Sequence, residues 1–227
     1  MNKKVVYTCI TGDYDDLHDP IVITKDFDYI CFTDSVDMKS DIWEIRPLPK
    51  EVENLSQVKK QRFIKINPHL FLSEYDISIW VDGSIYIKDD LNDFIRFVME
   101  HKYSLLMDKC SVFVPTHPYR KCAYIEANIF LRFFNDLVVK QMERYEKEGF
   151  PHNYGLLQSN ILLRKHNDPN CIKLMETWSN EVMNWCYRDQ FSFNYASWKN
   201  KDVEVKYIDR NIFHSKWFYW GGHKQKK

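Results

Sequence analysis

The 227-residue chain carries 32 Lys and Arg residues against 32 Asp and Glu residues, so its formal net charge is +0 at pH 7. This balance excludes a whole-protein field that would attract nucleic acid or an anionic membrane, although local basic patches remain open. The length fits one domain, because one core can grow to about 250 residues, and the aromatic fraction of 16% supplies rings for a core and for grooves where sugars or bases stack.

Apolar periodicity predicts strands that alternate with helices along the chain. The predicted strands are residues 5–10, 28–34, 43–48 (an edge strand, because Pro47 cannot donate to a ladder), 77–81, 85–87, 103–107, 112–114, 161–163 and 203–208. The predicted helices are residues 56–72, interrupted near Pro68, 91–101, 123–148 and 171–187. This order predicts an α/β fold with a mixed, mostly parallel sheet flanked by helices, in one domain over residues 1–227. Its basic end, residues 221–227, is either a flexible tail or an arm that reaches phosphate, and its length favours the tail.

Neither a signal peptide nor a membrane span is expected. The apolar run over residues 5–10 is too short for a signal peptide, and no segment approaches the ~18 apolar residues needed to cross a bilayer. The six cysteines form no C-x-x-C pair, which favours a reducing compartment and argues against structural zinc. We therefore expect a cytoplasmic protein that meets the inner face of the membrane, if at all, through its substrate.

Residues 78–85, SIWVDGSI, combine a buried strand with an exposed carboxylate. Asp82 ends the strand, and Gly83 allows a ligand to approach the backbone closely, so Asp82 is well placed to hold a divalent cation against a diphosphate. Asp-Gly is also a common turn sequence. Spacing alone leaves both interpretations open.

Six segments in chain order resemble a glycosyltransferase-like family formerly catalogued as a domain of unknown function (number 616). These segments are YTCITGDYD (7–15), YICFTD (29–34), RFIKINPHL (62–70), SIWVDGSI (78–85), HPYRKC (117–122) and RDQFSF (188–193). Together they span nearly the whole chain, and the ordered set is far more specific than any one segment. The resemblance implies a GT-A (Rossmann-like) fold and a nucleotide-sugar donor bound by the loop after the first strand.

The resemblance also implies a site for a divalent cation, Mn²⁺ or Mg²⁺, and the donor diphosphate at Asp82. Related enzymes usually carry two carboxylates there, as D-x-D, whereas this chain has Ser84 at the second position. Either Asp82 and Ser84 bind the metal with a C-terminal histidine, or no metal is tightly held. His214 is favoured over His223 as that histidine, although a lone histidine is more often a surface or core residue.

The candidate donor-binding residues are Thr11, Asp13, Tyr14, Arg62, Lys65, Asp82, Ser84, Gln158 and Asn160. A turn cluster, a solvated helix face or a loop entering a strand would explain several of them without function. The candidates for acceptor or sugar binding are His117, Arg120, Glu126 and Gln190. Asp189 is the candidate catalytic carboxylate, either a general base in an inverting reaction or a sugar ligand in a retaining one, while helix-end capping with Arg188 is its structural alternative.

We therefore expect a glycosyltransferase that moves a sugar from a nucleotide-diphosphate-sugar to a hydroxyl of a glycan or glycolipid acceptor, in surface polysaccharide (capsule or lipopolysaccharide) assembly. The alternatives are a glycoside hydrolase that uses Asp82 and Asp189, and a non-catalytic carbohydrate-binding protein on the same fold. The sequence has no G-x-S-x-G elbow, Gly-rich phosphate loop or G-x-G-x-x-G, so ester hydrolysis, ATP chemistry and dinucleotide redox work have little support.

Overall fold

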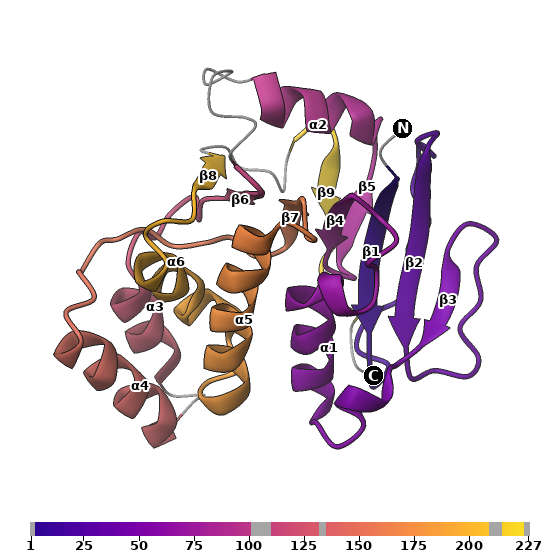
Figure 1. Cartoon of the computed structure of the whole chain (residues 1–227). Coiled ribbons are helices and arrows are strands. Elements are labelled where there is room, and N and C mark those ends of the chain that lie inside the picture. Colours follow the sequence, from indigo (N-terminus) through magenta and orange to yellow (C-terminus); the bar gives the residue numbers. More distant parts are fainter. Residues whose placement is uncertain (1–2, 101–109, 132–134, 209–214, 225–227) are drawn as a thin grey trace.

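A seven-stranded sheet runs through the middle of the molecule in the computed structural model, which describes residues 3–100, 110–131, 135–208 and 215–224 (Figure 1). Its strands are β1 (Lys4–Ile10), β2 (Phe27–Thr33), β3 (Glu44–Pro47), β4 (Ile77–Val81), β6 (Val112–Pro115), β7 (Ile161–Arg164) and β8 (Val205–Ile208). Their order is β3-β2-β1-β4-β7-β6-β8, with β3, β2, β1 and β4 mutually parallel. Strand β7 is antiparallel to β4 and β6, and β8 is parallel to β6. The predicted mixed, mostly parallel sheet is confirmed.

Two short strands form a second sheet, in which β5 (Ile85–Ile87) pairs antiparallel with β9 (Phe218–Trp220). The sequence prediction missed β9. Its residue Phe218 is fully buried and lies opposite Ile87, so this pairing ties the C-terminal segment to the chain just after β4.

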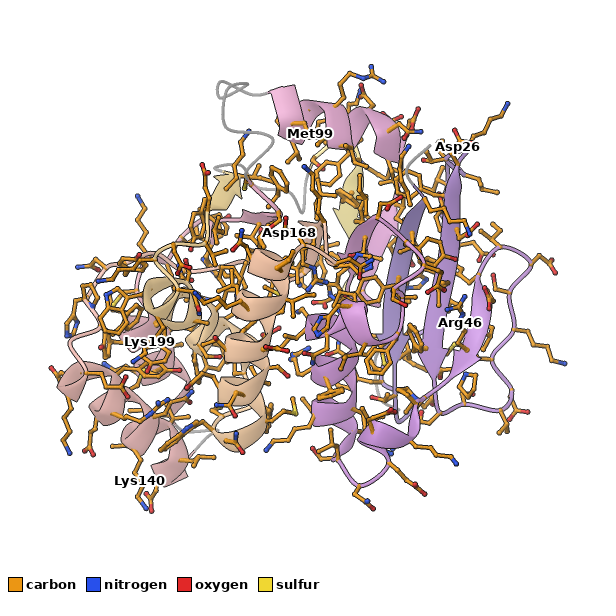
Figure 2. All side chains as sticks on the ribbon, in the orientation of Figure 1. Asp26, Arg46, Met99, Lys140, Asp168 and Lys199 are labelled. Atoms are coloured by element: carbon orange, nitrogen blue, oxygen red, sulfur yellow. The ribbon has the colours of Figure 1, made fainter. Side chains whose placement is uncertain are left out.

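The helices are α1 (Gln57–Ile66), α2 (Leu91–Glu100), α3 (Ala123–Phe130), α4 (Asn135–Lys147), α5 (Pro169–Asn184) and α6 (Phe193–Lys199), with single 3₁₀ turns η1 (Lys50–Val52), η2 (Pro68–Leu70) and η5 (Asp189–Phe191). Helix α1 ends just before Pro68, as expected for a residue that cannot continue a helix. Asp168, labelled near the centre of Figure 2, is the N-cap of α5, and its carboxylate accepts from the backbone N–H groups of Asn170 and Cys171.

Alternate residues of each central strand face different helical layers. Val5, Tyr7 and Cys9 of β1 join the core under α1, α5 and α6, where α1 and α5 lie side by side (Figure 1). Val6 and Ile10 join the opposite core, under α2 and the β5–β9 pair. The sheet is therefore covered on both faces, which leaves the ends of its strands as the place for polar loops.

The predicted helix over residues 123–148 is wrong, because α3 and α4 are separate helices that pack against each other. Tyr124 of α3 and Tyr145 of α4 both contact Phe150, each with ring centroids 5.8 Å apart. One straight helix would separate the two tyrosines by roughly 30 Å, at 1.5 Å per residue. The predicted strand over residues 103–107 lies outside the described residues, and the short helix α6 was not predicted.

Candidate functional site

The site lies where the strand order reverses. After β1, the chain forms β2 and β3 on one side of β1 within the sheet, and then forms β4 on the other side of β1. The loops after β1 and β4 meet there, since a Cβ added to Gly83 would stand 3.2 Å from both Asp15 Cβ and Ile10 Cγ1. In α/β sheets, ligands bind beyond the carboxyl ends of strands at such a switch point.

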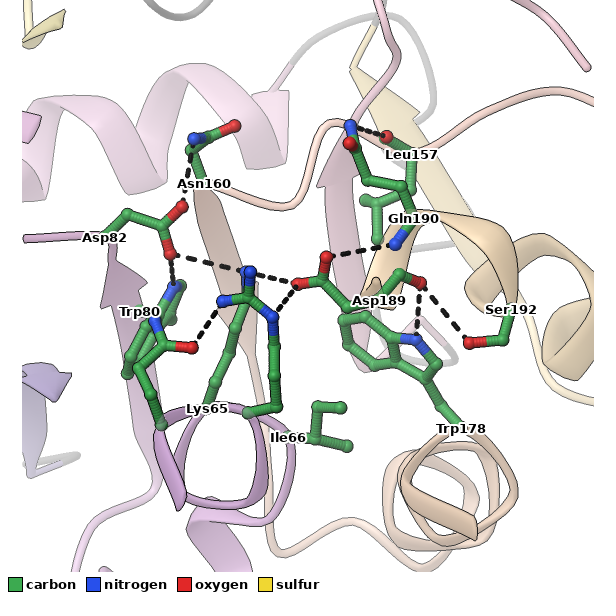
Figure 3. Close-up of polar contacts among 12 residues, drawn as sticks. Lys65, Ile66, Trp80, Asp82, Leu157, Asn160, Trp178, Asp189, Gln190 and Ser192 are labelled. Atoms are coloured by element: carbon green, nitrogen blue, oxygen red, sulfur yellow. Dashed lines mark hydrogen bonds and ion pairs between the residues drawn. The ribbon is translucent and has the colours of Figure 1, made fainter. Parts of the chain in front are cut away.

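Four predicted residues, Arg62, Lys65, Asp82 and Asp189, form one charge cluster beside these loops. Figure 3 labels Lys65, Asp82 and Asp189 of this cluster. Lys65 Nζ lies 3.3 Å from Asp82 Oδ1 and 2.6 Å from Asp189 Oδ2. Arg62 Nε lies 3.6 Å from the same oxygen of Asp189. The side chains of Lys65 and Asp189 are 0% and 3% exposed, whereas those of Asp82 and Arg62 remain 17% and 22% exposed. The two cations balance the two carboxylates, and only Arg62 and Asp82 remain partly open to solvent.

The end of α1 holds Lys65 in this position. The Lys65 carbonyl accepts hydrogen bonds from Tyr7 Oη (2.6 Å) and from Arg164 Nη2 (2.9 Å). Arg164 is fully buried, and its charge lies at the carboxyl end of the helix, where the helix dipole favours a cation. The Lys65 ammonium also lies 5.6 Å from the Trp80 ring centroid, within range of a cation–π contact.

Electrostatics keep Asp189 ionised. Burial by itself would raise the pKa of Asp189, but the charges of Arg62 and Lys65, with hydrogen bonds from Lys65 and Ser159, outweigh burial and hold the pKa well below its usual range. A carboxylate with such a low pKa is a weak base. The environment of Asp189 therefore disfavours the predicted role as a general base and suits the alternative prediction, a fixed charge that binds hydroxyls or orients neighbouring groups.

The described residues do not fit a divalent cation at Asp82. Asp82 Oδ1 accepts from Lys65 and from Trp80 Nε1 (2.8 Å), and Oδ2 accepts from Asn160 Nδ2 (2.9 Å). The Ser84 hydroxyl is buried and makes no hydrogen bond within the described structure. Among the described residues, no group of three His, Cys, Asp or Glu side chains is placed to hold a metal. The predicted ligand His214 lies outside the described residues.

The C-terminal segment contacts the loop after β1. Tyr14 is half exposed, and its ring meets the ring of His223 edge-on at 5.1 Å. His223 Nδ1 lies 3.1 Å from Asp15 Oδ1, and Lys224 Nζ lies 2.8 Å from Asp13 Oδ1. Residues 221–224 thus contact the loop after β1, and the rest of the tail predicted over residues 221–227 lies outside the described residues.

Thr11, the other predicted donor contact in this loop, is buried, and its hydroxyl donates to Gln57 O at 2.9 Å. This hydrogen bond joins the loop to the start of α1. In the structure Thr11 positions the loop that carries Asp13 and Tyr14.

A second polar cluster surrounds Glu126, which is fully buried. Its carboxylate pairs with Arg120 and, at 2.7 Å, with Arg188 Nη2. His117 Nδ1 accepts hydrogen bonds from the backbone N–H groups of Tyr119 and Arg120, so the neutral ring carries its proton on Nε2. Arg188 was missed as a site residue because it was considered only as a capping partner of Asp189, its neighbour in sequence.

The segment from Leu156 to Asn160 connects the two clusters. Gln190 donates from Nε2 to Leu157 O and from its backbone N–H to Asp189 Oδ1, both at 3.0 Å. Gln158 is buried, its backbone N–H donates to Pro115 O, and its side-chain Oε1 makes no hydrogen bond to any described residue. At the two ends of the segment, Asn160 donates to Asp82 Oδ2 and Leu156 O accepts from the His117 backbone N–H, so the segment joins the Asp82 cluster to the Glu126 cluster.

A match to a known domain family identifies the family of this chain. Residues 41–218 match the TOD1/MUCI70 glycosyltransferase-like domain. The chain belongs to the TOD1/MUCI70 family. This match includes β4, the Asp82 turn and both polar clusters, and it confirms the predicted membership of a glycosyltransferase-like family. No curated protein sequence matches the chain.

Solved structures show that this TOD1/MUCI70 domain has a glycosyltransferase fold. The bifunctional glycosyltransferase WbbM superposes with a TM-score of 0.50 at 11% identity, over 91% of this chain and 39% of the WbbM chain. Mouse xyloside xylosyltransferase 1 superposes with a TM-score of 0.51 at 9% identity, over 92% of this chain and 85% of that chain. The chain thus spans about two fifths of the length of WbbM. At these identities the likeness is one of fold.

None of the described helices in this family member is long and apolar enough to cross a membrane.

Proposed function

We propose that the chain transfers a sugar from a nucleotide-diphosphate-sugar to a hydroxyl group of a glycan or glycolipid acceptor, at the cytoplasmic face of the membrane during surface polysaccharide assembly. The observation that carries the proposal is the cluster of Arg62, Lys65, Asp82 and Asp189 at the switch point between β1 and β4. A family of glycosyltransferase-like domains and a glycosyltransferase fold support it.

The donor is proposed to lie over the loops after β1 and β4. Tyr14 offers an exposed ring for a base, and Asp13 offers a carboxylate for ribose hydroxyls. The diphosphate faces Arg62, the cation of the cluster that keeps partial exposure. When the bond between the sugar and the diphosphate breaks, negative charge grows on the departing phosphate, and a nearby guanidinium stabilises that charge.

The acceptor is proposed to bind next to the donor, beside His117 and Gln190. The Nε2–H group of His117 and the guanidinium groups of Arg120 and Arg188 supply hydrogen-bond donors for sugar hydroxyls. The acceptor oxygen bonds to the sugar carbon as the nucleoside diphosphate leaves, and the hydroxyl proton passes to a base or to solvent. Asp189 contributes fixed negative charge and orients Gln190.

A glycosidase mechanism is not favoured by this geometry. A glycosidase needs one carboxyl group that stays protonated near neutral pH to act as the acid. Here the pKa of Asp189 is held below its usual range, and Lys65 lies between Asp189 and Asp82.

A thermal-shift screen of nucleotide sugars tests the proposal. A ligand that binds only the folded chain at one hundred times its Kd adds about 2.7 kcal/mol, which raises the Tm by roughly 5–11 °C for a domain of this size. We expect a UDP- or GDP-sugar to give such a shift, Arg62→Gln to abolish it, and Lys140→Gln, an exposed change on α4 (Figure 2), to leave it intact.

Product analysis then separates catalysis from binding. Slow hydrolysis of the stabilising donor, or its transfer to added glycans, supports the enzyme. Tight binding with neither reaction would instead identify a non-catalytic carbohydrate-binding protein, and the absence of any shift across the donor panel would refute the proposed donor site.

A further inference from the structure

The cation that neutralises Asp82 is already part of the protein. Lys65 Nζ lies 3.3 Å from Asp82 Oδ1 and 2.6 Å from Asp189 Oδ2, with a side chain that is 0% exposed. The remaining hydrogen bonds to Asp82 come from Trp80 and Asn160. Three donors therefore occupy most of the roughly four lone-pair positions of this carboxylate.

We propose that Lys65 takes the position of the divalent cation in this domain, so that the donor diphosphate is bound without a metal. This inference rests on the proposed nucleotide-sugar donor. A metal ion bound to Asp82 would meet the Lys65 ammonium on the same oxygen, and it would join a cluster whose two carboxylates are already balanced by two cations. The sequence agrees with this view. A second carboxylate at position 84 would add the negative charge that a metal ion needs, but the residue there is Ser84.

Arg62 is the group left to meet the diphosphate. Its side chain is 22% exposed, and its Nε is 3.6 Å from Asp189 Oδ2, beyond hydrogen-bond distance. Its Nη1 donates to Gln61 Oε1, and its buried Nε makes no hydrogen bond to any described residue. Lys65 is fully buried and acts as a positioning residue, since it neutralises the carboxylates that would otherwise draw Arg62 away from phosphate.

The first test uses the unmodified chain. Binding of UDP and GDP is measured by isothermal titration calorimetry in buffer with EDTA and in buffer with MnCl₂. We expect the Kd of the bound nucleotide to agree within about twofold between the two buffers, because Lys65 and Arg62 supply the positive charge in both. Binding that needs Mn²⁺, or that tightens tenfold with it, overturns the inference.

The second test removes the internal cation. Lys65→Ala leaves Asp82 and Asp189 with Arg62 alone, so the cluster gains one net negative charge and space beside two carboxylates. We expect Mn²⁺ alone to raise the Tm of this variant but not that of the unmodified chain or of the control Lys60→Ala on the same helix. We also expect nucleotide affinity in Lys65→Ala to be lost in EDTA and recovered with Mn²⁺.

A purely structural lysine would give a different result. In that case Lys65→Ala would lose nucleotide affinity equally with and without Mn²⁺, and the assignment of Lys65 to the cation position would be refuted. Lys65→Met, which fills the volume of the side chain without its charge, replaces the alanine variant if the latter does not fold. If neither variant folds, the comparison of EDTA with Mn²⁺ on the unmodified chain decides.

The two proposals fail in different ways. Absence of nucleotide and nucleotide-sugar binding in every buffer refutes the glycosyltransferase donor site and this inference with it. Metal-dependent binding refutes only the inference and leaves the proposed reaction in place.

Discussion

Replacing Asp189 by asparagine tests whether the buried charge cluster holds the two halves of the site together. Asp189 follows α5, and Lys65 lies on α1, so their contact at 2.6 Å joins segments 124 residues apart. At an effective dielectric constant of about 20, two charges at that distance attract by roughly 6 kcal/mol. The cost of desolvating a buried carboxylate is several kcal/mol, which offsets much of that attraction.

Breaking a buried ion pair lowers the free energy of unfolding by more than this balance suggests, because the remaining charge stays buried without that partner. In Asp189→Asn, Lys65 keeps Asp82 at 3.3 Å, but the cluster then has two cations and one carboxylate. The unbalanced positive charge leads us to expect a loss of about 3–5 kcal/mol in the free energy of unfolding. Urea unfolding followed by far-UV circular dichroism at neutral pH measures it. Asp13→Asn, the same change at a carboxylate that is 83% exposed, serves as the control and should alter stability little.

The pH dependence gives a second readout of the same contact. The pKa of Asp189 is lowered in the folded state, so its contribution is fully present above the unfolded pKa of about 3.9 and is lost as the pH falls through the lower, folded value. The stability difference between the unmodified chain and Asp189→Asn should therefore be constant near neutrality and shrink below about pH 4. A difference under about 1 kcal/mol, or one that does not change in acid, would refute the electrostatic account.

Three further changes test other parts of the structure. Burial lowers the pKa of His166 to about 4, and its Nε2 donates to Leu72 O at 2.8 Å. The free energy of unfolding of the unmodified chain should therefore fall by up to about 3 kcal/mol as the pH drops from about 6.5 to 4. His166→Gln should flatten that part of the stability curve, and equal curves for the two proteins would contradict this assignment. Asp168→Ala should cost about 1 kcal/mol in urea unfolding by removing the N-cap of α5, and an unchanged midpoint would count against the cap. Glu126→Gln should lower the free energy of unfolding by about 3–5 kcal/mol, because two arginines lose their shared carboxylate. The exposed control Glu143→Gln should change it very little, and similar losses in both variants would argue against the buried pair.

The strands and the position of Asp82 followed from the sequence because their signals are local. Alternating or continuous apolar runs have the period of a strand, and β1, β2 and β4 were each predicted to within about a residue or two. Polar residues that follow a buried strand lie at the edge of the sheet wherever the strand ends, so the loop after β1 and the Asp82 turn could be assigned before the fold was known.

Only the tertiary structure decided how these residues are partnered. Lys65 was predicted, like Arg62, to bind the donor, yet it is buried between Asp82 and Asp189, which lie 17 and 124 residues away. Arg188 was considered only as a helix-end partner of Asp189, and it pairs with Glu126. Helical and strand periods are properties of a few consecutive residues, whereas the charge state and partners of a buried side chain depend on which distant elements pack against it.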